Sequence, residues 1–247
     1  MNSIAGGGTL LTFPALIALG VPPISANATS TVALWPGSIS SVWGYRALLR
    51  GARPWAVGFA LPSLLGGAFG AWLLLRTPPQ RFSDIVPWLV LGATALFMAQ
   101  RPVMGWLARR REPRAESRQR ESDDVLTSRW PPPYILVYQF LVAIYGGYFG
   151  AGVGILMLAA LGFMGLSNIH RMNGLKNWGG VCMNVVAAAI FAFSSLVNWP
   201  VALAMAIGAV AGGYLGSRTA QRVPQDFVRG AVVAIGLSSG LLLFLTR

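Results

Sequence analysis

Two groups of polar residues interrupt long apolar stretches of this 247-residue chain, at positions that could contact a ligand. The groups are Asn27, Thr29 and Thr31 in the first half and Asn173, Lys176 and Asn177 in the second. Amides, hydroxyls and ammonium groups donate hydrogen bonds, and Lys176 is the only lysine in the chain. The two groups therefore favour the binding of a small anion over acid–base chemistry.

A glycine cluster precedes each polar group, at the start of a strongly apolar segment. The clustered glycines are Gly6, Gly7 and Gly8 in AGGGTLLTFP and Gly150, Gly152 and Gly154 in FGAGVGILML. A helix that starts after such a break directs free N–H groups and the positive end of its dipole at the break. We therefore expect two ligand-binding tips, although the glycines could instead serve only close helix packing.

The composition indicates an integral membrane protein. Hydrophobic residues make up 55% of the chain and charged residues only 11%, and the mean hydropathy is +0.59. The charge-free intervals 53–76 and 229–247 each have about the length of one membrane-spanning helix, roughly 20 residues. The intervals 1–46, 129–171 and 176–218 are about twice as long and are expected to hold two membrane segments each.

The chain also contains an internal duplication. A constant shift of 146 positions, without a gap, places Asn27 on Asn173 and the sequence GGAFG at 66–70 on GGYLG at 212–216. Matches in the same order at one spacing predict two copies of one helical unit.

The duplication predicts three regions: a first membrane repeat at 1–106, a charged linker at 107–130 and a second repeat at 131–247. The linker and the loop after the second apolar segment are rich in arginine, so both are expected to face the cytoplasm. The matching loop of the second repeat, at 194–200, carries no charge and is expected outside. The opposite charge bias predicts that the two repeats are inverted relative to each other.

The expected fold is therefore an all-α polytopic membrane protein with two inverted repeats of about four membrane segments each. Inversion needs an odd number of crossings per repeat, which follows if residues 134–166 enter the membrane, turn at the glycines and leave on the same side. Broken segments at matching positions of inverted repeats are the pointer to a central transport site. The helix that would enter the first tip has no counterpart in the sequence, so we expect the natural chain to begin upstream of Met1.

Two signatures of this sequence resemble those of the TauE/SafE sulfite exporter family. The first is AGGGTLLTFPALIALGVPPISANATSTVALWPGSISSVWGYR, and the second, more divergent, is FGAGVGILMLAALGFMGLSNIHRMNGLKN. The resemblance covers essentially the whole chain. It implies a multi-pass carrier of the bacterial cytoplasmic membrane that exports small sulfur-containing anions such as sulfite or organosulfonates.

Other residues near the second polar group have simpler interpretations. His170 and Arg171 could form a gate or a vestibule that attracts the substrate, or could be ordinary interfacial residues. Lys176 could bind the anion, or could extend from a helix end to the membrane surface. The tryptophans are interpreted as packing or interfacial residues: Trp35, Trp43, Trp88, Trp178 and Trp199.

Alternative functions remain open in the same membrane class. A passive anion channel or an importer of another small organic anion could use the same tips. An intramembrane enzyme is disfavoured, because the apolar segments offer only His170 and no interior carboxylate. The expected partners are the anionic substrate and membrane lipid, with no nucleic acid, metal or cofactor. The sequence leaves the oligomeric state open.

Overall fold

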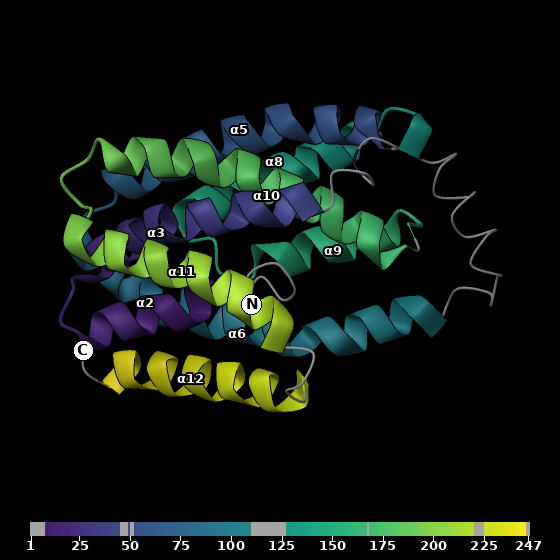
Figure 1. Ribbon diagram of the computed structural model, residues 1–247. Coiled ribbons are helices and arrows are strands. Elements are labelled where there is room, and N and C mark those ends of the chain that lie inside the picture. Colours follow the sequence, from purple (N-terminus) through teal and green to yellow (C-terminus); the bar gives the residue numbers. More distant parts are fainter. Residues whose placement is uncertain are drawn as a thin grey trace.

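The structure, a computed structural model, describes residues 8–44, 49, 52–109, 127–166, 168–219 and 225–245. All the regular elements in these residues are helices, which lie side by side in one bundle (Figure 1). They are α2 (Gly8–Ala18), α3 (Pro23–Gly44), α5 (Arg53–Arg76), α6 (Pro79–Arg109), α8 (Pro133–Tyr148), α9 (Val153–Phe163), α10 (Ile169–Ala192), α11 (Trp199–Thr219) and α12 (Gln225–Leu245). The predicted all-α class is confirmed.

Several of the helices have the length and composition of membrane spans. Within the described residues, the ranges Arg53–Arg76, Pro79–Gln100 and His170–Ala192 are long and apolar enough to cross a bilayer. Large apolar side chains also point outward from the bundle, including Phe193 at 95% exposure and Ile207 at 72%. An apolar outer surface of this kind suits a lipid environment, so the protein is a polytopic helical membrane protein.

The helix boundaries follow the repeat found in the sequence. Helices α3, α5 and α6 begin 146 positions before α10, α11 and α12, respectively, and α2 and α9 agree with this shift to within one position. The packing partners are exchanged in the same way: α3 packs on α11, whereas α10 packs on α5. The equivalent helices α3 and α10 therefore each pack against a helix of the other repeat, and those two partner helices, α11 and α5, are also equivalent.

Helices α6 and α12, which are equivalent in the two repeats, run antiparallel to each other. The Trp88 ring, early in α6, contacts Phe244, late in α12, with 5.1 Å between ring centroids. Further along α6, Thr94 lies against Gly236, which is earlier in α12. Opposite directions of equivalent helices are what an inverted repeat requires, and the orientation of the repeats in a membrane stays a prediction.

The second repeat opens with a helical hairpin, α8 and α9, which meet at a turn over 149–152. At the open end of the hairpin, the Tyr134 hydroxyl donates to Met164 Sδ at 3.1 Å. Near the turn, the Tyr145 hydroxyl donates to the Ala151 carbonyl at 2.6 Å. Helix α9 therefore folds back along α8, as expected for a segment that enters and leaves on one side.

Close contacts through glycine bring α5 against both α8 and α10. A Cβ atom on Gly66 would lie 2.6 Å from Ala143 Cβ on α8, and one on Gly67 would lie 2.5 Å from the Met183 carbonyl oxygen on α10. Only a residue without a side chain fits at these two positions. The hairpin and α10 are thereby held beside the same helix, which fixes the position of the hairpin turn next to α10.

Candidate functional site

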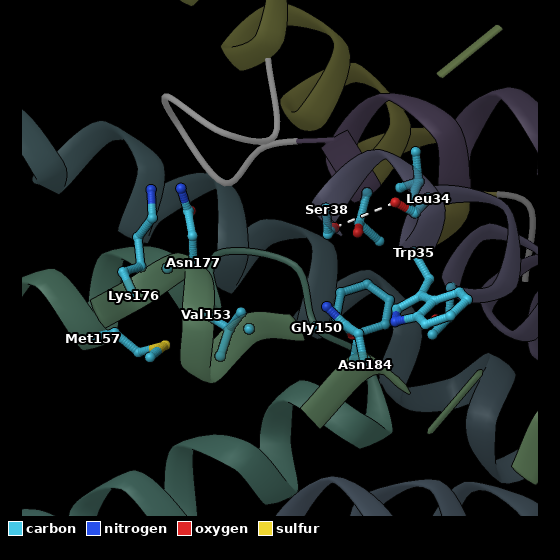
Figure 2. Close-up of a pocket in the computed structure, with 14 residues that line it drawn as sticks. Leu34, Trp35, Ser38, Gly150, Val153, Met157, Lys176, Asn177 and Asn184 are labelled. Atoms are coloured by element: carbon cyan, nitrogen blue, oxygen red, sulfur yellow. Dashed lines mark hydrogen bonds between the residues drawn. The ribbon is translucent and has the colours of Figure 1, made fainter. Parts of the chain in front are cut away.

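A cavity of about 70 Å³ lies where the hairpin turn meets α2, α3, α9 and α10 (Figure 2). Its volume exceeds the roughly 10–15 Å³ needed to hold one buried water. Five of the predicted site residues line it: Thr31, Gly150, Gly154, Lys176 and Asn177. The structure therefore brings parts of both polar groups together with one of the two glycine clusters.

The hairpin turn has its shape because of two glycines. Gly150 and Gly152 have φ values of +80° and +78°, a left-handed backbone conformation that other residues adopt only with strain. Gly152 is the N-cap of α9, and the first residues of that helix, Val153 and Gly154, line the cavity. The N-terminal end of α9 therefore faces the cavity, where its partial positive charge favours an anion.

Matching faces of α3 and α10 form two walls of the cavity. Thr31 and Ser38 on α3 are seven residues apart, so they lie on one helix face two turns apart. Asn177 and Asn184 on α10 line the cavity with the same spacing, and they are the equivalents of Thr31 and Ser38 under the shift of 146. The cavity thus lies between the two repeats. Sequence reasoning missed Ser38 and Asn184, although their helical spacing from Thr31 and Asn177 was a signal.

Lys176 gives the cavity its charge. The residue is only 4% exposed, and its neighbour Asn177 extends beside it in the same direction (Figure 2). None of the 14 described residues that line the cavity is acidic. A buried ammonium group in a membrane helix costs about 2.5–3.5 kcal/mol on insertion scales. A buried cation beside a cavity in a membrane protein is therefore a candidate ligand-binding residue.

Asn27 and Thr29 are fully buried but do not line the cavity. Asn27 Nδ2 donates to the Tyr148 carbonyl at the end of α8, at 2.8 Å. Thr29 Oγ1 accepts from the backbone N–H of Asn198, just before α11, at 3.0 Å. Both side chains therefore join the first repeat to the second, and their predicted role as substrate ligands stays a prediction.

The remaining described members of the predicted tips lie around the cavity and not on it. Asn173 is half-buried, and its Oδ1 atom has no hydrogen-bond partner within the described residues. Gly8 is the buried first residue of α2. A Cβ on Gly152 would lie 3.5 Å from the backbone of Ala93 on α6, so this glycine packs against a helix. Gly6 and Gly7 lie outside the described residues.

The predicted gate residues are also placed away from the cavity lining. His170 is exposed at the start of α10, where its backbone N–H donates to the Asn168 side chain at 3.0 Å. Arg171 is 8% exposed, and its Nη1 donates to Thr127 Oγ1 at 3.0 Å. Arg171 therefore holds the end of the linker against α10. A gating role for this pair stays a prediction.

The tryptophans were interpreted as packing or interfacial residues, and Trp35 differs because it lies at the cavity. Trp178 Nε1 donates to the Ala56 carbonyl at 2.7 Å, which fits a packing residue. Trp35 lines the cavity, on the same wall as Thr31 and Ser38. The sequence gives no sign of this difference, because both residues follow polar groups in apolar helices.

A polytopic helical protein with a cationic cavity between two repeats has the architecture of a membrane carrier. The family model described as Sulfite exporter TauE/SafE matches residues 1–243, so the chain belongs to the TauE/SafE family. The resemblance seen in the two sequence signatures is confirmed.

Relatives of known name are similar over nearly the whole chain. The probable membrane transporter protein ORF9 of a Sinorhizobium species is 28% identical, covering 98% of this chain and 87% of its own length. A probable membrane transporter protein of Haemophilus influenzae is 28% identical over 94% of this chain and 85% of its own. The probable membrane transporter protein YfcA of Escherichia coli K12 is 27% identical, with corresponding shares of 95% and 81%. No solved structure matches the chain significantly.

The family and these relatives establish the coarse function. The protein is a membrane transporter and not an enzyme, as predicted.

Proposed function

We propose that the protein exports small sulfur-containing anions, such as sulfite or organosulfonates, across the bacterial cytoplasmic membrane. The observation that carries the proposal is the burial of Lys176 on a cavity between the two repeats, with no acidic residue among the described residues that line it. The helix dipole of α9 adds positive potential at the same place. The family description, a sulfite exporter, supports the choice of anion.

The proposed orientation places the linker at 107–130 in the cytoplasm and the loop at 194–200 outside. Arginine-rich loops remain on the cytoplasmic side during insertion, which supports this assignment. The apolar side chains that point outward from the bundle would then contact membrane lipid. Helices α2, α3, α9 and α10 and the hairpin turn would then surround the cavity near the middle of the membrane.

The membrane potential supplies a driving force for export. An anion that leaves a cell with a negative interior gains about 2.3 kcal/mol per charge per 100 mV. Proton-coupled carriers commonly place Asp, Glu or His on the pathway, and the described lining of this cavity has none of them. We therefore propose electrogenic export that does not pass a proton through the cavity.

The test is flux in proteoliposomes loaded with sulfite. We expect efflux that saturates with sulfite concentration, increases when a voltage attracts the anion outward, and responds only weakly to a pH gradient after sulfite protonation is corrected for. Sulfoacetate, taurine and thiosulfate as competitors would rank the anions, with chloride as the control for non-specific anion binding.

Three results would contradict the proposal. Efflux that never saturates would favour a passive channel, and a preference for uptake at every imposed voltage would favour an importer. A strong response to a pH gradient at zero voltage, abolished by His170→Gln, would show that the transport is coupled to protons.

A further inference from the structure

The two ends of the bundle differ at equivalent positions of the repeat. At one end, the α2–α3 turn and the α10–α11 loop line an open pocket of about 450 Å³, which includes Gly20, Ser25 and Asn198. Gly20 and Asn198 are exposed there, and Ser25 is half-buried. The proposed orientation places this pocket on the outer side of the membrane, because it contains part of the loop at 194–200.

The equivalent positions at the other end are sealed. Under the shift of 146, the residues equivalent to these three are, in the same order, Leu166, Arg171 and Ala52. Leu166 and Ala52 are fully buried in one apolar cluster, and Arg171 is 8% exposed. The end that is proposed to face the cytoplasm is therefore closed at the positions where the outer end is open.

A short segment at the end of the linker covers the closed end. This segment, residues 127–131, lies just before α8 and is called the latch below. Thr127 is fully buried, and its Oγ1 accepts a hydrogen bond from Arg171 Nη1 at 3.0 Å. At the other end of the latch, Pro131 packs on Gly58, where a Cβ atom would lie 2.7 Å from Pro131 Cγ. The latch thus contacts α10 and α5 near their starts, one helix from each repeat.

The latch is stiffly connected to the hairpin that forms part of the cavity. Residues 131–133 are three consecutive prolines, and Pro132 has an extended backbone with φ of −62° and ψ of 148°. Proline fixes φ, and a run of prolines acts as a semi-rigid spacer. A displacement of the latch therefore also displaces α8, and the turn between α8 and α9 lines the cavity.

A carrier must make its binding site accessible from each side of the membrane in turn, and inverted repeats do so by moving against each other around the site. We propose that the latch closes a cytoplasmic gate. The hydrogen bond from Arg171 to Thr127 holds the two repeats together at that end, and its release lets the anion reach the cavity from the cytoplasm. The inference rests on the proposed function and deepens it, and Arg171 acts through the latch without touching the anion.

The latch is specific to the cytoplasmic end. Ser25, the equivalent of Arg171, carries a short uncharged side chain and lines the open outer pocket. The guanidinium group of Arg171 keeps its charge at every physiological pH. Opening of the gate therefore needs no proton, which agrees with the electrogenic export proposed above.

The first experiment measures how often the cytoplasmic end opens in the full-length protein. Ala52→Cys places a thiol at a sealed position, and Ser195→Cys places one in the outer pocket, where Ser195 is exposed. Both probes are made in a Cys182→Ala background, because Cys182 is the only native cysteine. The rate of reaction with a soluble maleimide is measured for each thiol in purified protein.

The rates are compared between three variants of the latch contact. Thr127→Val removes the hydroxyl that accepts the hydrogen bond, and Arg171→Gln removes its donor. Arg129→Gln is the matched control, since Arg129 is an exposed arginine of the latch itself. The thermal midpoint of each variant is recorded in parallel.

We expect Thr127→Val to raise the reaction rate of the Ala52→Cys thiol about tenfold, because the closed state loses a hydrogen bond to a charged group. Arg171→Gln should raise it at least as much, and Arg129→Gln should leave it within about twofold. The Ser195→Cys thiol should react equally fast in all variants. Equal rates at Ala52→Cys in every variant would overturn the role of the latch, and this result requires no substrate.

The second experiment fixes the latch in place. Gly58→Cys and Pro131→Cys together bring two Cβ atoms to no more than about 4 Å from each other, within the range of a disulfide bond. We expect the oxidised protein to lose sulfite flux in proteoliposomes and to regain it with dithiothreitol. Pro131→Cys alone, which cannot form the bond, should transport under both conditions.

The outcomes separate this inference from the proposed function. Full sulfite flux through the cross-linked protein would overturn the latch and leave the proposed function intact. Absence of sulfite flux from the wild type would overturn the proposed function. In that case the maleimide rates would still decide whether the latch closes the cytoplasmic end.

Discussion

Ser30 in the first repeat and Lys176 in the second occupy equivalent positions beside the cavity, but their side chains have different roles. Ser30 is fully buried, and its hydroxyl lies 2.6 Å from that of Thr12 on α2. The equivalent of Thr12 on α9 is Leu158, which has no hydroxyl to offer. Lys176 instead lines the cavity.

The comparison shows how a symmetric helical frame acquires an asymmetric site. The same helix faces approach the cavity in both repeats, as the pair Thr31 and Asn177 and the pair Ser38 and Asn184 show. In the first repeat, the hydrogen bond between Ser30 and Thr12 joins α3 to α2. In the second repeat, the position equivalent to Ser30 is Lys176, which supplies a positive charge. Under the proposed function, the first repeat contributes mainly to packing, and the second contributes most of the attraction for an anion.

The largest effect is expected when the polar group is removed from each of these two equivalent positions in turn. Lys176→Met should lower sulfite binding by more than about tenfold and nearly abolish transport, because the cavity loses its cation. Ser30→Ala should leave transport nearly intact and lower the free energy of unfolding by about 1 kcal/mol, since one hydrogen bond is lost. Proteoliposome flux and chemical unfolding measure the two quantities, with Lys176→Arg as a control that keeps the charge. Wild-type transport by a more stable Lys176→Met variant would identify Lys176 as an anchor at the membrane surface.

An intermediate effect is expected at the hairpin turn. Gly152→Ala forces a side chain into a backbone conformation with φ of +78° and should cost about 1–2 kcal/mol of stability. Transport should fall as well, because the turn sets the start of α9 at the cavity. Gly20→Ala in the first repeat is the matched control, since Gly20 has φ of +80°, open space around it and no place in the cavity lining. Equal loss of transport in both variants would mean that backbone strain alone, and not the position of α9, explains the effect.

The smallest effect distinguishes the paired asparagines. Asn27→Ala removes the hydrogen bond to the Tyr148 carbonyl and should lower the free energy of unfolding by about 1 kcal/mol. Asn173→Ala should change it by less than about 0.5 kcal/mol, because its Oδ1 has no partner among the described residues to lose. Both variants should transport more slowly than the wild type. Thermal and chemical unfolding check the difference, and an equal loss of stability would show that Asn173 also joins the two repeats.

Much of the site could be predicted from residue types and spacing. The glycine break before α9 was visible because two glycines so close together cannot continue a helix without cost. Lys176 and Asn177 were visible because a cation and an amide are unusual within an apolar segment. Thr31 followed from the shift of 146, which places it on Asn177.

Other parts of the site depended on how the helices are rotated against each other. Asn27 and Thr29 looked equivalent to Thr31 in the sequence, yet their side chains bond to α8 and to the start of α11. Trp35 looked like the other tryptophans, yet it lines the cavity. Helical periodicity shows which residues share a face, but packing against other helices decides what each face meets.

The sequence by itself determined the membrane class, the helical repeat and the family, because each of these depends on composition and on local spacing. The tertiary structure alone decided that Trp35, Ser38 and Asn184 meet Lys176 around one cavity. It also decided that the equivalent helices α6 and α12 run antiparallel. The physical reason is that these relations come from contacts between helices far apart in the chain, which depend on the close fit of many side chains at once.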